Sequence, residues 1–515
     1  MKYVCVDTVE FLYPDVHEYQ SGTDRINILS PRGSYACAQV FFYEGSGNVA
    51  ITCEGWNPEI YEMVAIPVEY NALITEENKA PYTPVREAPF YVYDCLKPFD
   101  GEAAFKDGVC GIYFSMWIPE DAPTGIIEAS VQVRDVKIPV TVEVSSAVVP
   151  KESLTVLMGY DQAKVCQYHK VEKGSQKFEE LDTEYLSLCR RGRQNALYAP
   201  SVIGVAVGND QYEFDFSELE AFMGKAIPFG YKLFTSAIAG KESHWKPELY
   251  VGGEELHLHA TSMEAYCYLA QYMTSLADFL EERGWSDNYA VSIVDEPEKS
   301  HYLEYRVLFG IIKKFAPKIK VLEASSYGEL HGAMDIYVPL SAEYEEHKDA
   351  FDTYKKYGDE VWYYDCLAPR GSGYINRYMD NTLLSTRYHG WANYAYNLTG
   401  YLHWAVNRYQ PGQDPFTQSC PQHINIDDTT PALPAGDTHI IYPGDSGPWM
   451  SVRLENQRAG AEEYEMLRAL EKTDKKLADF LCDSVFHSFK NVEYNPINFR
   501  NTRNALIRAM ENKNG

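Results

Sequence analysis

The stretch Tyr289-Ala-Val-Ser-Ile-Val-Asp-Glu-Pro297 indicates how most of this chain folds, because an apolar run of strand length ends abruptly in two acids and a proline. Similar short apolar runs recur on both sides of it, separated by longer amphipathic segments such as 263–283, and this alternation is typical of βαβ units with a parallel sheet. Eight strands are expected, at 155–160, 196–199, 232–238, 290–294, 320–324, 334–338, 360–364 and 400–406. Eight such repeats predict a (β/α)8 TIM barrel rather than an open doubly wound sheet.

The residues before the barrel follow a different pattern. Apolar residues alternate with polar ones at 127–133 and again at 138–144, with Asp135 at the turn between them, which predicts a β-hairpin. Pro139 lacks an N–H, so its strand is expected at a sheet edge or at a bulge. The α/β chain is therefore predicted to consist of an antiparallel β-sandwich domain (1–150), the barrel (151–485) and a C-terminal helical tail (486–515).

Composition limits the partners. The 515 residues carry a net charge of -28, which argues against nucleic acid and anionic membranes as partners, while 41 Tyr and 8 Trp suit a carbohydrate ligand. The start of the chain lacks the pattern of a secretory signal, and the 11 cysteines form no CxxC pair. A cytoplasmic protein is expected, although removal of a signal peptide would leave the same sequence. The oligomeric state is not indicated.

Asp295 and Glu296 are the candidate catalytic residues. Barrel enzymes take their reacting groups from the carboxyl ends of the strands, and two acids at the end of a buried strand are costly unless they are used. Repulsion and burial can separate the pKa values of such a pair, so that one acid keeps a proton while the other is ionised. Pro297 favours an extended backbone at Glu296. In the alternative interpretation, Asp295 only caps a helix and Glu296 is solvated.

Several side chains near other strand ends are expected to bind the substrate, because aromatic walls with a few polar groups are typical of sugar sites. They are Tyr337, Tyr363, Tyr364, Trp404 and Asn407, together with His244 and Trp245 in the loop after the third strand. Packing in the core is the alternative for each ring, and a surface position is the alternative for His244 and Trp245. The Pro/Gly/Asp-rich segment 410–447 is expected to form a functional loop over the barrel mouth.

No metal or cofactor is expected. His257 and His259 form an HxH pair, but it precedes a helix instead of ending the first strand, so we interpret it as a loop feature. Glycine loops that bind phosphate and motifs for Ser or Cys nucleophiles do not occur, which leaves phosphoryl and acyl transfer without support.

The segment Val294-Asp-Glu-Pro297 resembles the catalytic signature of glycoside hydrolase family 123, the β-N-acetylgalactosaminidases. Further similarity lies in Val361-Trp-Tyr-Tyr-Asp-Cys366, Met379-Asp380, Arg387, Trp391, Gly400-Tyr-Leu-His-Trp404, Asn407, Tyr442-Pro-Gly444, Ser451-Val-Arg-Leu-Glu455 and Arg458-Ala-Gly-Ala-Glu-Glu-Tyr464. The last of these departs from the family's usual Glu-Asp-Tyr form at one acid. The resemblance covers the barrel and its closing helix, and the family also has an amino-terminal β-sandwich.

The resemblance implies substrate-assisted catalysis, in which the acetamido oxygen of the sugar attacks the anomeric carbon and the configuration is retained. Asp295 would orient the acetamido group and stabilise the oxazolinium ion, and Glu296 would protonate the leaving oxygen and later activate water. Tyr364 would donate to the acetamido oxygen, and Trp404 would form the floor of the subsite.

Three hypotheses follow. The first is a metal-independent, retaining exo-β-N-acetylhexosaminidase that favours N-acetylgalactosamine and acts on an oligosaccharide or glycoconjugate. The second is a glycosidase for a sugar without an acetamido group, with a second carboxylate such as Asp365 as nucleophile, about 5 Å from Glu296. The third is a carbohydrate-binding barrel without hydrolytic activity.

Overall fold

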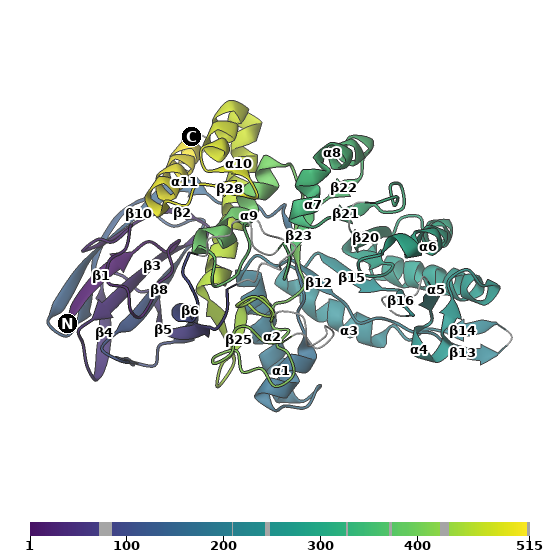
Figure 1. Ribbon diagram of the computed structural model, residues 1–515, viewed down its shortest axis with the longest axis horizontal. Helices are drawn as coiled ribbons and strands as arrows, with labels where there is room; N and C mark the ends of the chain where they lie inside the picture. The colour runs from purple at the N-terminus through teal and green to yellow at the C-terminus, as the bar shows by residue number, and fades with distance from the viewer. Residues whose placement is uncertain are drawn as a thin grey trace.

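The computed structural model describes residues 1–71, 85–208, 210–242, 248–325, 328–369, 373–422 and 432–511. Two β-sheets form one side of the molecule and face each other across a hydrophobic core (Figure 1). The larger sheet has the order β1 (Lys2–Val6), β3 (Ser34–Tyr43), β8 (Cys110–Ile118), β5 (Glu59–Val68), β6 (Phe90–Pro98), β26 (Pro448–Ser451) and β25 (Ile441–Pro443). The smaller has the order β2 (Ile26–Arg32), β10 (Val136–Val148), β9 (Gly125–Val133), β4 (Asn48–Glu54) and β7 (Glu102–Ala104).

The predicted hairpin is β9 and β10, which pair in antiparallel register from Val136 opposite Val133 onward. Ile138, Val140 and Val142 are fully buried in the core between the sheets, as their alternation requires. The prediction for Pro139 is wrong in one respect, because β10 lies inside the sheet, with β9 on one side and β2 on the other. The register with β2 begins only at Val140, so the missing N–H of Pro139 interrupts no ladder on that side.

The larger sheet also takes two strands from the far end of the barrel segment. After the last barrel strand the chain returns to this sheet, where β25 pairs with β26 and β26 pairs with β6. The sheets and the barrel are therefore tied together by backbone hydrogen bonds as well as by side-chain packing.

The second part is a nearly closed parallel barrel surrounded by helices, as predicted (Figure 1). Its strands, all within the described residues, follow the order β22 (Glu360–Val361), β21 (Ile336–Val338), β20 (Lys320–Ala324), β19 (Tyr289–Ser292), β15 (Leu233–Ala237), β12 (Ala196–Tyr198), β11 (Thr155–Met158), β24 (Gly400–His403) and β23 (Tyr363–Asp365). Each contains part of one of the eight predicted strands. The seventh predicted strand is broken at Trp362 into β22 and β23, which lie at the two ends of the sheet order.

Side chains alternate between the inside and the outside of this barrel. A small cluster that includes Leu157, Ala290, Leu322, Val338 and Leu402 fills the interior. Their neighbours along the same strands, for example Val156, Val291, Val321, Tyr337 and Tyr401, belong to the large cluster between the barrel and its helices. A residue's place in its strand therefore decides whether it can reach the barrel mouth.

Several helices around the barrel begin at a residue whose side chain accepts a hydrogen bond from the backbone of the first turn. Ser262, for example, accepts a hydrogen bond from the backbone of Ala265 and starts α5, whose one apolar face is buried. The α-helices in the barrel segment are α1 (Gln162–His169), α2 (Gln176–Arg191), α3 (Ser217–Ala226), α4 (Gly253–Leu256), α5 (Met263–Glu282), α6 (Tyr302–Phe315), α7 (Ser341–Glu346), α8 (Lys348–Tyr357), α9 (Leu383–Ala395) and α10 (Val452–Asp483). Short hairpins are formed by β13 (Val205–Gly208) with β14 (Gln211–Glu213), and by β16 (Ala239–Lys241), β17 (Leu249–Val251) and β18 (Leu258–His259).

The long helix α10 lies at the junction of the two parts. Nearly all of its first half is buried, including its charged residues, and it packs closely on α9 through Gly390 and Gly460. A methyl group at Gly460 would come within 2.3 Å of the carbonyl oxygen of Arg387, so only glycine allows this approach. Beyond it follow β27 (Phe486–Ser488), β28 (Asn491–Val492) and α11 (Pro496–Glu511), and α11 lies beside β2 and β10 (Figure 1).

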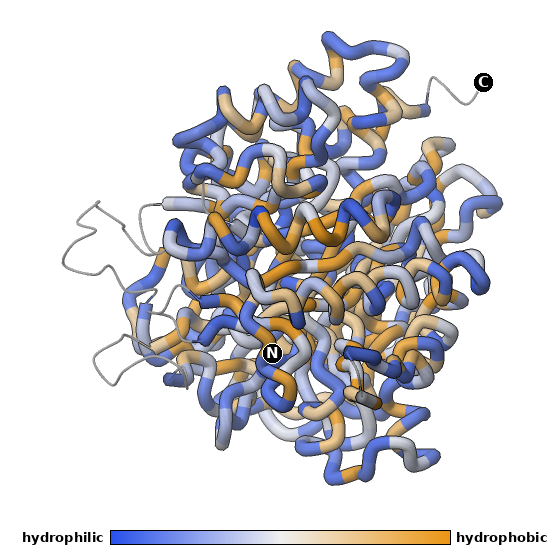
Figure 2. The backbone as a smooth tube through the Cα atoms, turned by 90° about the vertical axis from the view of Figure 1, so that its right-hand side faces the viewer, coloured by the Kyte–Doolittle hydropathy of each residue, from blue (hydrophilic) through white to orange (hydrophobic). Residues whose placement is uncertain are grey.

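Hydrophobic segments gather in the interior of the molecule and hydrophilic ones at its periphery (Figure 2). Within the described ranges, none of the helices combines the length and the apolar character needed to cross a bilayer.

Candidate active site

The fourth barrel strand, β19, is completely buried, and its end is fixed by a carboxylate from the next strand. Ile293 and Val294 donate their backbone N–H groups to Oε2 of Glu323, at 2.8 and 3.0 Å, and the hydroxyl of Ser292 donates to Oε1 at 2.7 Å. Burial raises the pKa of Glu323 to about 8, the hydrogen bond from Ser292 opposes this shift, and the negative charge of Asp295 adds to it. Glu323 therefore stabilises the turn that carries the acid pair.

Asp295 and Glu296 follow this turn and are exposed. Pro297 predicted an extended backbone at Glu296, but the φ angle of Glu296 is +45°, in the left-handed region that residues other than glycine seldom adopt. Two contacts hold this conformation: the N–H of Glu296 donates to the carbonyl oxygen of Ala324 at 3.1 Å, and Lys241 donates to the carbonyl oxygen of Glu296 at 2.9 Å. Such backbone strain is a frequent property of reactive sites.

Tyr364 is in direct contact with the acid pair. It extends from β23 into the barrel interior, and its hydroxyl donates to Oε1 of Glu296 at 2.6 Å. Burial, together with the charge of Glu296, raises the pKa of Tyr364 far above its ordinary value, so the phenol remains a hydrogen-bond donor. Two residues predicted from different strand ends, Glu296 and Tyr364, are thus brought together.

Trp404 follows β24 and is half-buried. Its indole N–H donates to Oδ2 of Asp437 at 3.0 Å, and the other oxygen of Asp437 lies 3.3 Å from Nε2 of His403. Burial lowers the pKa of His403 well below its ordinary value, and the positive charge of Arg377 adds to this, so the imidazole is neutral at physiological pH. Asp437 belongs to the segment 410–447, so the described part of that loop helps to orient a predicted site residue.

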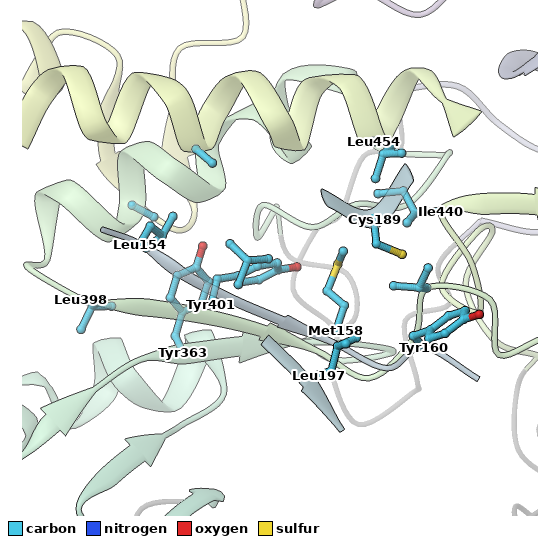
Figure 3. Close-up of a cluster of buried hydrophobic side chains, with 14 of the residues drawn as sticks. Leu154, Met158, Tyr160, Cys189, Leu197, Tyr363, Leu398, Tyr401, Ile440 and Leu454 are labelled. Atoms are coloured by element: carbon cyan, nitrogen blue, oxygen red, sulfur yellow. The ribbon is translucent and has the colours of Figure 1, made fainter. Parts of the chain in front are cut away.

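Three other predicted residues lie elsewhere. Tyr337 and Tyr363 point out of the barrel: Tyr337 stacks on Tyr354 at 4.7 Å between ring centroids, and Tyr363 lies in the layer of buried side chains that faces the helices (Figure 3). Asn407 is fully buried, and its side-chain amide binds both the N–H and the carbonyl oxygen of Asp161, at 2.9 and 3.0 Å. In this structure Asn407 joins the end of the eighth strand to the turn after the first.

His244 and Trp245 lie outside the described residues, as does the part of the predicted loop at 423–431.

The second carboxylate of the rival hypothesis, Asp365, has no exposed surface. It accepts a hydrogen bond from the hydroxyl of Tyr401 at 2.6 Å and lies 3.5 Å from Nε2 of His389, on the outer side of the barrel wall. Burial raises the pKa of Asp365 to about 8. The arrangement leaves no room for a sugar beside this carboxylate.

Each histidine of the HxH pair lies beside a carboxylate side chain. Nε2 of His257 lies 2.6 Å from Glu242, and Nε2 of His259 lies 3.3 Å from Glu304. Among the described residues no group of three or more His, Cys, Asp or Glu side chains is arranged to hold a metal ion.

Sequence analysis missed four residues that shape this end of the barrel: Tyr198, Glu323, Arg408 and Asp437. Tyr198 is the last residue of β12 and Arg408 directly follows Asn407, so a search of every strand end would have found both. Burial raises the pKa of Tyr198, and the negative charge of Asp295 contributes to the shift, which indicates that the two side chains are close. Glu323 is visible in the sequence as an acid near the end of an apolar strand, but its contacts, like those of Asp437, are with residues distant in sequence and cannot be read from it.

A cavity of about 640 Å³ lies elsewhere, between the N-terminal sheets and the helices α10 and α11. The arginines that line it include Arg387, Arg458 and Arg503, and each forms an ion pair with a carboxylate of α10. We therefore assign this cavity to the packing of the sheets against α10.

Comparison with known proteins adds two findings. Residues 169–470, which include the acid pair, match the family described as glycoside hydrolase 123, catalytic domain. A solved structure of a family 123 glycoside hydrolase from Clostridium perfringens, which concerns glycolipid glycan hydrolysis, has 14% sequence identity, covers 99% of this chain and 98% of that chain, and gives a TM-score of 0.75. At this identity the likeness shows the fold, and it extends over the β-sheets as well as the barrel.

Two further solved structures are much less similar. A glycosyl hydrolase family 2 member from Bacteroides cellulosilyticus has 10% identity, covers 78% of this chain and 46% of that chain, and gives a TM-score of 0.29. A β-D-glucuronidase from Dictyoglomus thermophilum has 9% identity, covers 85% and 69%, and gives a TM-score of 0.33. TM-scores this low support no conclusion about the fold or function of the chain. No curated protein sequence matches the chain.

Proposed function

The chain belongs to glycoside hydrolase family 123, and on this premise we propose that it is a retaining exo-β-N-acetylhexosaminidase that favours N-acetylgalactosamine. One observation carries the proposal: an exposed pair of adjacent acids ends the fourth barrel strand, and a phenol from the seventh holds one oxygen of Glu296. Because Oε1 of Glu296 is held by Tyr364, its other oxygen is available for proton transfer to a bound substrate.

In the first proposed step, the acetamido oxygen of the substrate attacks the anomeric carbon as the bond to the leaving oxygen breaks. Glu296 donates its proton to that oxygen, and Asp295 accepts a hydrogen bond from the acetamido N–H and stabilises the positive charge of the oxazolinium ion. The nucleophile belongs to the substrate, so holding it in the correct orientation supplies a large part of the acceleration.

In the second step, water attacks the anomeric carbon from the face that the leaving group vacated. Glu296 takes the proton from this water, the oxazoline C–O bond breaks, and the acetamido group is restored. The two inversions give net retention, which agrees with two acids serving neighbouring parts of one sugar ring. Trp404, oriented by Asp437, is proposed as the apolar floor under the ring.

The proposed substrate is the non-reducing end of an oligosaccharide or glycoconjugate. A cytoplasmic location is also proposed, since all eleven cysteines are free thiols. The buried position of Asp365 gives no support to the second hypothesis.

Hydrolysis of nitrophenyl glycosides tests the proposal. Wild type and Glu296→Gln are compared on the β-N-acetylgalactosaminide, the β-N-acetylglucosaminide and the plain β-galactoside, and the anomer released first is identified by NMR. The proposal requires turnover of an acetamido sugar with retention, competitive inhibition by a thiazoline that mimics the intermediate, and a rate that is about 10²- to 10⁴-fold lower in the variant. Turnover of the plain galactoside alone would overturn it.

A further inference from the structure

Arg408 lies at the mouth of the barrel, where its backbone is fixed on both sides. It follows Asn407, whose side chain is bound to Asp161, and precedes Tyr409, whose hydroxyl donates to the carbonyl oxygen of Ile441 at 2.6 Å. Its own N–H donates to the carbonyl oxygen of Thr438 at 2.9 Å. Because the backbone is held in place, the guanidinium group can reach only partners close to the barrel mouth.

The guanidinium lies over the ends of the first two barrel strands. Its carbon is 5.8 Å from the centroid of the Tyr198 ring, and a methyl group at Gly159, directly after β11, would come within 2.7 Å of its Nε. Tyr198 packs against the interior cluster of the barrel, and burial raises its pKa, to which the charge of Asp295 adds and which the charge of Arg408 opposes. Arg408 and Asp295 thus approach the same phenol, at the same end of the barrel.

The buried arginines among the described residues have partners for their charge, and Arg377, which forms no ion pair, donates to the carbonyl oxygens of Ala405 and Asp437. Arg387, Arg453 and Arg458 are each paired with a carboxylate. Among the described residues, no carboxylate pairs with Arg408, and its Nε is buried without a hydrogen-bond acceptor. The Nε of Arg377 has no acceptor either, but Arg377 is enclosed in the core, whereas Arg408 is only half-buried. A buried donor on a charged group is costly when it is left unsatisfied, so a ligand that enters the barrel mouth and supplies oxygen acceptors is expected at Arg408.

The chemistry of the expected ligand follows from the shape of the group. A guanidinium presents its donors in a planar fork that matches the oxygen atoms of a carboxylate or a sulfate. The net charge of -28 repels an acidic glycan at long range, so recognition of such a substrate requires a local cation at the site.

We propose that this enzyme acts on acidic glycans, and that Arg408 binds an oxyanion of the substrate next to the acid pair. This inference rests on the proposed function. The oxyanion is either a sulfate ester on the N-acetylhexosamine or the carboxylate of a uronic acid in the adjoining position. Arg408 is in this sense a residue that determines specificity.

Two substrate pairs distinguish these sources: nitrophenyl β-N-acetylgalactosaminide with and without a sulfate on its primary hydroxyl, and a disaccharide with glucuronic acid or its methyl ester as the leaving sugar. The measured quantity is the ratio of kcat/KM between the acidic and the neutral member of each pair. Wild type is expected to prefer the acidic member of one pair by about 10- to 100-fold, the contribution of a charge-assisted hydrogen-bond pair. The pair that shows the preference identifies the source.

Variants of the protein test whether the preference for the acidic substrate depends on Arg408. The ratio is expected to fall to near unity in Arg408→Met, to be kept in part in Arg408→Lys, and to stay at the wild-type value in Arg134→Met, which removes an exposed arginine of the β9–β10 turn. Thermal unfolding shows whether each variant is folded. Equal rates for both members of both pairs in wild type, or an unchanged ratio in Arg408→Met, would overturn the proposal.

A binding measurement separates this inference from the proposed function. If no acetamido sugar is hydrolysed, the proposed function fails, and calorimetry with sulfated and unsulfated N-acetylgalactosamine, and with glucuronate and its methyl ester, decides the role of Arg408 alone. Tighter binding of an acidic member by wild type, lost in Arg408→Met, supports an oxyanion site. Equal binding of both members of each pair contradicts it.

Discussion

Carboxylates have opposite surroundings at the barrel mouth and along α10. At the mouth, Asp295 and Glu296 are exposed, and Glu296 is held by a phenol rather than by a cation. Along α10, Glu455, Glu462 and Glu463 are buried and each is paired with at least one arginine. Acids neutralised by arginine fix the structure, whereas an acid such as Glu296, which is exposed and held by a phenol, can change its protonation during a reaction.

The pairing along α10 is dense enough to keep its acids ionised. Although burial opposes ionisation, Arg191 and Arg458 hold the pKa of Glu455 at about 2. Glu463 accepts hydrogen bonds from Nε and Nη2 of Arg387, at 2.9 and 2.6 Å, and from the indole N–H of Trp391 at 2.8 Å. These bonds join α9 to α10, where the barrel meets the β-sheets.

The largest expected effect is on activity, from the substitution Asp295→Asn. An amide keeps the size of the side chain but loses the charge that stabilises the oxazolinium ion, so kcat should fall about 10²- to 10⁴-fold. The loss should be the same for nitrophenyl and dinitrophenyl leaving groups, while the loss in Glu296→Gln should shrink with the better leaving group. Glu298→Gln, which removes an exposed acid nearby, is the matched control. Equal activity of Asp295→Asn and this control would contradict the assignment.

The second effect is on stability, from Glu463→Gln. The substitution leaves the buried Arg387 without its counter-charge, which should lower the free energy of unfolding by about 3–5 kcal/mol. Glu471→Gln, on the more exposed part of α10, should cost less than about 1 kcal/mol. Chemical denaturation measures both. If Glu463→Gln also lowered kcat strongly at a temperature where it is folded, the distinction between structural and reactive acids would not hold.

Substitutions of the adjacent residues Tyr363 and Tyr364 are expected to have smaller effects, but they distinguish the inner from the outer face of one strand. Tyr364→Phe removes the donor to Glu296 and should lower kcat about 10- to 100-fold, with little change in stability. Tyr363→Phe removes a hydroxyl that lies 3.0 Å from Nδ1 of His389 on the outside of the barrel, and should lower the melting temperature without changing kcat. The opposite result would show that the two side chains were assigned to the wrong faces of the strand.

The sequence predicts the position of the barrel strands better than the direction of their side chains. Each strand is a continuous apolar run because both of its faces are buried, so the run locates the strand but carries no alternation to distinguish inside from outside. For this reason the sequence predicts the same role for Tyr337, Tyr363 and Tyr364, although Tyr337 and Tyr363 point away from the barrel interior. The acid pair was predictable because adjacent acids interrupt an apolar run, which local pattern alone can reveal.

Contacts between residues distant in sequence escaped prediction for a different reason. Glu323 looks like a misplaced acid in an apolar strand, and only the structure shows that it binds the backbone at the end of the strand beside it. The left-handed backbone of Glu296 depends in the same way on Ala324 and Lys241, which override the local preference set by Pro297.

The last expected effect is a dependence of stability on pH and concerns Glu323, the buried acid beneath the mouth. Its pKa is raised from 4.5 to about 8, so the folded protein binds this proton more tightly than the unfolded chain does. Its contribution to stability is therefore fully present below pH 4.5 and is lost as the pH rises toward 8, with a slope of up to about 1.4 kcal/mol per pH unit. Asp365 has a raised pKa as well and contributes with the same sign, so the informative quantity is the difference between wild type and Glu323→Gln.

Glu323→Gln cannot lose a proton, and its melting temperature should therefore fall less steeply than that of wild type between pH 5 and 8. A difference between the two proteins that does not vary with pH would mean that Glu323 is ionised throughout this range. It would then resemble the acids of α10, with the hydrogen bonds from Ser292, Ile293 and Val294 taking the place of arginine. In that case donors from the backbone and from a hydroxyl would suffice to keep a buried acid charged, and arginine would not be the only means of fixing a carboxylate in this molecule.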